Sequence, residues 1–192
     1  MIVNGLPGAG KSTLASALAG ELGVNWLSKD LIKEALADAV APDLEPHLGM
    51  VAMQTVWHFA ARTPGLVLVD SWWFRPRDRE HAARGIAAAG ADHVVEVWCR
   101  VPPELARQRY EARSRHAVHR DDRPMDDLWA GWAAEGEPLG LGPVIEVDTD
   151  REVDVARLAS AVTAKLAGKA VSRVDCAVID SPDGQGSAPH SP

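Results

Sequence analysis

The chain has 192 residues, 46% of them hydrophobic, which is typical of one globular domain with a sizeable core. It has neither an apolar stretch long enough to span a membrane nor an export signal at its N-terminus, so we expect a cytoplasmic protein. The formal net charge of −7 disfavours a nucleic acid as partner, because such binding depends on Lys and Arg, and it leaves the oligomeric state open.

A complete phosphate-binding loop of the form G-x-x-x-x-G-K-[ST] lies between an apolar strand stub at residues 1–3 and a helical pattern that ends at Gly23. Its glycines allow backbone N–H groups to surround a polyphosphate, Lys11 reaches the β- and γ-phosphates, and the Ser12 hydroxyl ligates Mg²⁺. The loop therefore predicts a bound polyphosphate and Mg²⁺, and it leaves the choice between an adenine and a guanine nucleotide open. The predicted nucleotide-binding residues of this loop are Gly5, Pro7, Gly8, Ala9, Gly10, Lys11, Ser12 and Thr13.

Apolar runs and helical patterns alternate along the rest of the chain, which is typical of parallel strands joined by helical crossovers. Further strands are expected at 24–27, 66–69, 94–98 and 144–147. Helices are expected from near Leu31, over 47–62, from Pro76 to Gly90, from Pro103 through an arginine cluster, over 125–132 and over 153–166. This pattern predicts an α/β protein: a three-layer αβα P-loop NTPase fold with a five-stranded parallel sheet and a helical arginine lid.

The domain is expected to occupy residues 1–168, with the lid at about 114–127. Residues 169–192 are predicted to form a mostly disordered tail, because from Ser181 onward there are too few apolar side chains to offset the entropy of ordering. Residues 170–180 could instead add a strand or pack on the domain.

Asp30 follows the second predicted strand and is the candidate base that accepts a proton from an attacking hydroxyl. It precedes a helical pattern, so a helix N-cap is the alternative. Asp70 ends the run 66–69 and, with Ser12, is the candidate Mg²⁺ ligand; its alternative is a cap for the turn before Pro76.

Trp72 and Trp73 come directly after Asp70 and could present two exposed indoles to a ring-containing acceptor, or could be core residues. Arg109 and Arg113 are four residues apart, a spacing that would place both on one helix face for a polyphosphate, or on a solvated face. Lys11, Asp30, Arg109 and Arg113 are the candidate catalytic residues. The candidate acceptor-binding residues are Asp30, Lys33, Trp72, Trp73, Arg77 and Arg115.

These residues make the chain resemble the P-loop small-molecule kinases of the AAA-type ATPase group, which is similar to polynucleotide kinase domains, chloramphenicol phosphotransferase and zeta-type toxins. The resemblance covers about residues 1–167 and rests on GLPGAGKST at 5–13, Asp30, VLVDS at 67–71 and PPELARQRYEARSRH at 102–116. It implies ATP with Mg²⁺, phosphates held by Lys11 and lid arginines including Arg109, and Asp30 as base. The turn at 147–149 resembles the part of the family near the adenine, which implies a nucleotide contact by Thr149.

We therefore expect an ATP-dependent phosphotransferase that acts on a hydroxyl of a small molecule, such as a natural product or an antibiotic. One alternative is a polynucleotide 5′-hydroxyl kinase, which residues 72–74 (Trp-Trp-Phe) disfavour. The other is a nucleotide-binding ATPase switch that signals to a protein partner and has no small acceptor.

Overall fold

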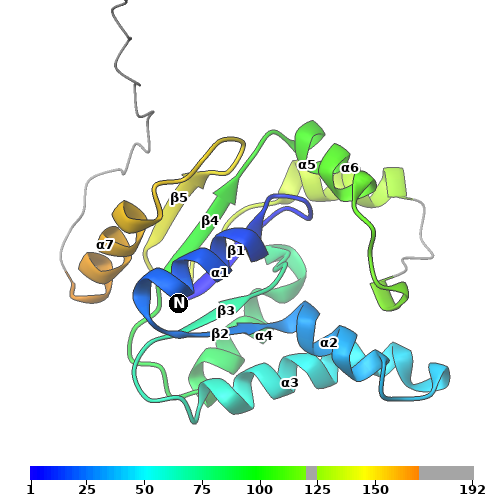
Figure 1. Ribbon diagram of the computed structural model, residues 1–192, viewed down its shortest axis with the longest axis horizontal. Coiled ribbons are helices and arrows are strands. Elements are labelled where there is room, and N and C mark those ends of the chain that lie inside the picture. The colour runs from blue at the N-terminus through cyan, green and yellow to red at the C-terminus, as the bar shows by residue number, and fades with distance from the viewer. Residues whose placement is uncertain (120–124, 169–192) are drawn as a thin grey trace, which may run out of the picture.

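The computed structural model describes residues 1–119 and 125–168 and has a five-stranded parallel sheet at its centre (Figure 1). The strand order is β2-β3-β1-β4-β5, so β2 and β3 lie on one side of β1 while β4 and β5 lie on the other. Ligands of such sheets bind at the carboxyl ends of the strands, where the order reverses, and here the reversal falls beside β1. The strands are β1 (Ile2–Gly5), β2 (Asn25–Ser28), β3 (Val67–Asp70), β4 (Glu96–Arg100) and β5 (Val144–Asp148).

The strand register aligns the carboxyl ends at one edge of the sheet. Gly5 pairs with Cys99, and Ser28 at the end of β2 pairs with Asp70 at the end of β3. On the other side, Arg100 pairs with Asp148. The loops that follow these strands therefore meet at a common edge.

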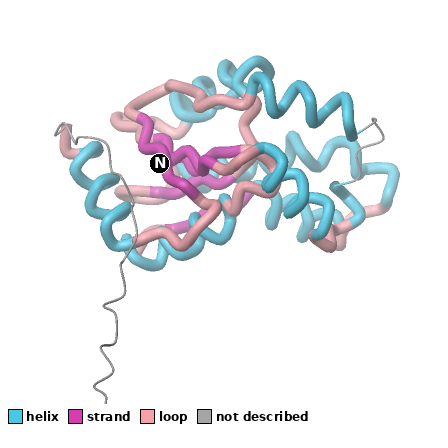
Figure 2. The backbone as a smooth tube through the Cα atoms, turned by 90° about the horizontal axis from the view of Figure 1, so that it is seen from above, coloured by secondary structure: helices cyan, strands magenta, loops and turns pink. Residues whose placement is uncertain are grey.

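Helices cover both faces of the sheet, which gives the three layers predicted from the sequence (Figure 2). Successive residues of a strand point to opposite faces. Val3 and Leu68 belong to the core formed with α1 and α7, whereas Ile2 and Val69 belong to the core with α3 and α4. In the described part of the chain, each helix is too short or too polar to cross a membrane. The helices are α1 (Lys11–Leu22), α2 (Lys29–Ala37), α3 (Leu48–Ala60), α4 (Arg75–Ala88), α5 (Pro103–Ala112), α6 (Met125–Glu135) and α7 (Val155–Leu166).

Several predicted boundaries differ from those observed. The strand expected at 94–98 runs from Glu96 to Arg100, and the helix expected near Leu31 starts at Lys29. Two short 3-10 helices, Pro42–His47 and Ala117–His119, were not predicted. The predicted lid overlaps the second of these and the first turn of α6; its residues 120–124 and the predicted tail 169–192 lie outside the described residues.

Candidate active site

The phosphate-binding loop connects the central strand β1 to α1 in a conformation that depends on glycine. Gly8 and Gly10 have φ angles of 83° and 81°, which residues other than glycine adopt only at a cost in free energy. Helix α1 starts without a side-chain cap and has no acidic residue in its first turn. Its N-terminal N–H groups and its dipole are therefore available to bind an anion in the loop.

Neighbouring elements hold this loop closely. A Cβ on Gly8 would lie 2.0 Å from the carbonyl oxygen of Ala106 in α5, so the loop backbone packs directly against that helix. The Thr149 hydroxyl donates to the carbonyl of Ala9 at 2.7 Å, and Arg109 Nη1 of α5 donates to the carbonyl of Thr149 at 2.9 Å. Thr149 and Arg109, both predicted nucleotide contacts, thus lie together beside the loop.

Lys11 is positioned by the loop that contains it. Its Nζ donates to the carbonyl of Leu6 at 3.0 Å and lies 5.9 Å from the centre of the Trp72 ring. Burial lowers the pKa of Lys11, and the carboxylate of Asp70 acts in the opposite direction. An anionic phosphate would add a second negative group next to this desolvated ammonium, so the site fits a polyphosphate.

Asp70 lies at the end of β3, where it is only 2% exposed. Burial raises the pKa of Asp70, while Lys11 and hydrogen bonds from the hydroxyls of Ser12 and Ser28 lower it. Ser12 and Asp70 thus bring a hydroxyl and a carboxylate oxygen together, the donor types that Mg²⁺ prefers. Asp70 does not cap α4, because there the Asp78 carboxylate accepts from the backbone N–H of Phe74 at 2.9 Å.

Asp30 lies in the first turn of α2, and the cap of this helix is Ser28 instead. The Ser28 hydroxyl accepts from the backbone N–H of Leu31 at 3.5 Å, which leaves the carboxylate of Asp30 free of that role. Burial alone would raise the pKa of Asp30, but Lys29, His119 and Lys11 outweigh it, and the pKa lies below its usual value. The carboxylate is therefore ionised at neutral pH, 3.7 Å from Lys29 Nζ.

Arg109 and Arg113, which were expected to share a helix face, lie at the C-terminal end of α5. Helix α5 ends at Ala112, and Arg113 is its C-cap, with φ −87° and ψ 128°. Arg109 reaches the Thr149 turn, whereas Arg113 is close enough to Lys11 to lower its pKa. The two arginines serve different parts of the site.

The segment after α5 packs onto α2. Lys33 Nζ donates to the carbonyl of Val118 at 2.9 Å, and the His119 ring contacts the carboxylate of Glu34 at 2.8 Å. The guanidinium of Arg115 stacks on the Tyr110 ring at 4.5 Å and hydrogen-bonds to its hydroxyl. Arg115 also lowers the pKa of Asp30, after larger contributions that include burial and Lys29. Lys33 and Arg115 therefore lie near Asp30 with their cationic groups already in contact with protein atoms.

The two adjacent tryptophans do not form one exposed platform, contrary to that alternative. Trp73 is 4% exposed and packs on Trp57, with ring centres 5.9 Å apart. Trp72 is half-buried and meets Trp132 edge-on at 6.2 Å. Successive residues of an extended segment point in opposite directions, which separates the two rings. Both nevertheless line a cavity between α3 and α4, together with Arg77, whose side chain pairs with Asp78 at 2.7 Å.

Several residues of this region were missed by sequence reasoning. Ser28 was overlooked, although a serine directly before a helical pattern is a standard cap signal. Trp57 was not among the predicted site residues, yet it lines the cavity beside α4. No local signal could have located that cavity, because its walls come from helices separated in sequence.

Comparison with known proteins identifies the family of this chain. A family model described as an AAA domain matches residues 1–133, more than half of the chain. The chain belongs to this family. None of the curated proteins compared matches it.

Solved structures place this AAA-domain chain among P-loop kinase folds. A protein assigned as a kinase from Chloroflexus aurantiacus is similar at a TM-score of 0.69 and 26% identity, covering 86% of this chain and 97% of that one. Shikimate kinase from Acinetobacter baumannii is similar at a TM-score of 0.57 and 20% identity, covering 87% of this chain and 92% of that one. The tunicamycin resistance protein of Deinococcus radiodurans has a TM-score of 0.51 and 15% identity, covering 88% of this chain and 95% of that one. The resemblance to P-loop kinases and the predicted fold class are thus confirmed.

Proposed function

We propose that this chain is an ATP-dependent kinase that transfers the γ-phosphoryl group to a hydroxyl of a small molecule, with residues 1–168 as its kinase domain. The position of Asp30 is the observation that supports this most. Its ionised carboxylate lies close enough to Lys11 of the phosphate loop to affect that residue's pKa, and it is 3.7 Å from Lys29, which lines the cavity beside the loop. A base between a phosphate site and an acceptor site is the arrangement that phosphoryl transfer needs.

The nucleotide would be held from three directions. The loop N–H groups and Lys11 bind its phosphates, Arg113 adds positive charge near Lys11, and Arg109 with Thr149 contacts the part remote from the phosphates. Mg²⁺, bound through Ser12 and Asp70, would neutralise charge that develops on the phosphates.

The acceptor oxygen forms a bond to the γ-phosphorus of ATP, and the bond from that phosphorus to the β–γ bridging oxygen breaks, leaving its electron pair on ADP. The hydroxyl proton passes to Asp30 and from there to solvent. A carboxylate with a lowered pKa is a weak base, so its larger contribution is to orient the hydroxyl. Phosphoryl transfer has a loose transition state, in which positioning and charge compensation supply most of the acceleration.

A small acceptor fits the site better than a polynucleotide. The adjoining cavity has a volume of about 870 Å³, within the range of sites for drug-sized ligands. The net charge of −7 opposes a long polyanion. A natural product or an antibiotic is the class we propose.

Transfer of label from γ-labelled ATP tests the proposal. Sugars, nucleosides, hydroxylated antibiotics and a 5′-hydroxyl oligonucleotide are compared as acceptors, with Asp30→Asn and the exposed Asp43→Asn as matched variants. Label should enter a small molecule, Asp30→Asn should suppress the transfer while ATP still binds, and Asp43→Asn should have no effect. Label in the oligonucleotide alone, or ATP binding with no labelled product, would contradict the proposal.

A further inference from the structure

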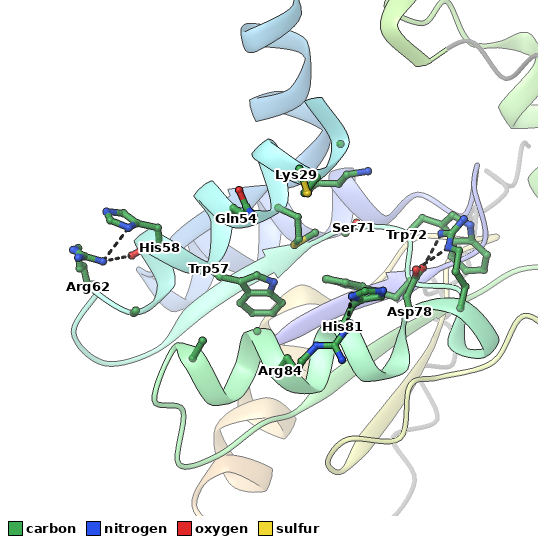
Figure 3. Close-up of a pocket in the computed structure, with 18 residues that line it drawn as sticks. Lys29, Gln54, Trp57, His58, Arg62, Ser71, Trp72, Asp78, His81 and Arg84 are labelled. Carbon is green, nitrogen blue, oxygen red and sulfur yellow. Dashed lines mark hydrogen bonds and ion pairs between the residues drawn. The ribbon is translucent and has the colours of Figure 1, made fainter. Parts of the chain in front are cut away.

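The cavity between α3 and α4 has a composition that indicates what the acceptor looks like (Figure 3). It lies at the end of β3, where Ser71 follows Asp70, and its volume is about 870 Å³. Figure 3 shows Trp57 reaching from α3 toward α4, with Gln54 on the α3 side and Arg84 on the α4 side.

Three indole and two thioether side chains supply the large apolar groups of the cavity wall. Trp57 and Trp73 pack together at 5.9 Å with their planes only 33° apart, and Met50 and Met53 line the same space. Flat indoles bind planar rings by stacking, and methionine adapts its shape to them. The walls therefore favour a planar ring system over a sugar.

Gly85 sets the position of the Trp57 ring. A Cβ at Gly85 would lie 2.1 Å from Cε2 of Trp57, so the indole lies directly on the backbone of α4. Any larger residue at position 85 would push this ring into the cavity. The volume of the cavity therefore depends on position 85 having no Cβ.

Positive charge surrounds this apolar interior. Four Lys and Arg residues and one carboxylate, Asp78, line the cavity. Asp78 pairs with Arg77 at 2.7 Å and Lys29 pairs with Asp30 at 3.7 Å, so the remaining cations are Arg62 and Arg84. Among the described residues, Arg62 has His58 as its only hydrogen-bond partner. Arg84 hydrogen-bonds to the His81 ring at 2.8 Å and lies 3.9 Å from the exposed Glu80. In a chain with a net charge of −7, such a local excess of cations favours an anionic ligand.

The cations are spread along the cavity. Lys29 and Ser71 lie at the end next to Asp30 and the phosphate loop, and Arg62 lies at the other end (Figure 3). Arg84 extends from α4 between them, beside His81. A ligand with its hydroxyl at Asp30 would extend from Lys29 toward Arg84.

We propose that the acceptor is a planar compound of at least two fused rings with an acidic group on the side of the rings away from the phosphorylated hydroxyl. Trp57 and Arg84 determine this specificity, through stacking and through the acidic group respectively. The term acceptor rests on the proposed function, whereas the ligand class rests on the cavity alone.

Two dyes with the same rings test the ligand class by binding. 8-Anilinonaphthalene-1-sulfonate carries an acid and N-phenyl-1-naphthylamine does not; the binding of both is followed by their fluorescence with excitation through the indoles. The sulfonate should bind about fivefold more tightly or better, as expected for one charged contact. Arg84→Gln should remove this preference, whereas the exposed Arg157→Gln on α7 should retain it.

Gly85→Ala should weaken the binding of both dyes, and Phe59→Ser, which alters an exposed ring outside the cavity, should leave it unchanged. Trp57→Leu provides the same readout if Gly85→Ala does not fold. Equal affinity for the two dyes, a preference that survives Arg84→Gln, or full binding by the cavity variants would overturn the inference.

Transfer of label to 6-hydroxy-2-naphthoic acid and to 2-naphthol separates this inference from the proposed function. The acid should be the better acceptor by kcat/KM, and Arg84→Gln should reduce that advantage. A sulfonate preference in binding without label transfer to any hydroxyl compound would contradict the proposed function and support the ligand class. Transfer to neutral sugars without any dye preference would overturn the ligand class and support the kinase activity.

Discussion

Asn4 and Glu96, on the neighbouring strands β1 and β4, share a buried hydrogen bond of 3.0 Å between Asn4 Nδ2 and Glu96 Oε1. Glu96 also accepts from the backbone N–H groups of Leu139 and Gly140, at 2.9 and 3.1 Å. Asn4 Oδ1 accepts from the backbone N–H of Trp73 at 3.0 Å. This pair therefore joins the loop before β5 to the segment that supplies a wall of the cavity.

Asn4→Ala is expected to destabilise the fold by about 3 kcal/mol, because it leaves several buried polar groups without partners. Urea unfolding measures the loss. Trp73 should also become less constrained, so dye binding in the cavity should weaken in the folded variant. A change below about 1 kcal/mol, the size of a single exposed contact, would show that water replaces Asn4 without cost.

Asp70→Asn is expected to raise the melting temperature of the ligand-free protein near neutral pH. Because burial raises the pKa of Asp70, its ionised form is less stable in the folded chain than in the unfolded chain. The melting temperature should rise by on the order of 2–4 °C for each kcal/mol by which the substitution increases the free energy of unfolding. It should shrink as the pH falls through the raised pKa and vanish once the group is protonated in both states.

Calorimetry of both proteins across acid and neutral pH checks this sign. The same variant should lose Mg²⁺-dependent transfer, since the carboxylate next to Ser12 is gone. A lower melting temperature near neutral pH would mean that the attraction to Lys11 exceeds the cost of burial.

Gly8→Ala should be more damaging than Gly10→Ala, although the two positions have almost the same φ. The left-handed conformation costs roughly 1–2 kcal/mol in each variant. A Cβ at position 10 has only Thr149 Cβ nearby, at 3.9 Å, whereas at position 8 it meets the Ala106 carbonyl. The clash should add about 1–3 kcal/mol to the loss of stability. Equal losses would indicate that α5 moves away freely.

Lys11→Ala should lower the kcat/KM for ATP by about 100-fold or more, as the removal of one preorganised charge does in other active sites. Its fold should be retained, because burial lowers the pKa of Lys11 and the charged form is costly without phosphate. Lys165→Ala, on α7 and remote from the loop, is the matched control. Turnover at the normal rate in Lys11→Ala would remove this residue from the mechanism.

The phosphate loop, the five strands and most helices could be predicted, since each depends on local pattern. The cap of α2 was missed because only Asp30 was considered for it, whereas the Ser28 hydroxyl accepts the hydrogen bond from the Leu31 N–H. The separation of Trp72 from Trp73 required the path of the chain after β3.

The cavity was beyond sequence reasoning for a different reason. Gly85 has an ordinary helical position, and its importance becomes visible only when Trp57, from another helix, is found against it. Arg113 was placed on α5 because spacing alone does not reveal where a helix ends.

Ser28 has a consequence for how the two proposed ligands affect each other's affinity. Its one hydroxyl caps the helix that carries Asp30 and also hydrogen-bonds to Asp70. A metal ion that bound Asp70 would weaken or redirect the hydrogen bond from Ser28, and so would change the N-terminal cap of α2. An acceptor that bound at α2 would in turn change the environment of Asp70 through the same hydroxyl. This coupling is reciprocal. If the metal–nucleotide complex raised the affinity for the acceptor by some factor, the acceptor would raise the affinity for that complex by the same factor.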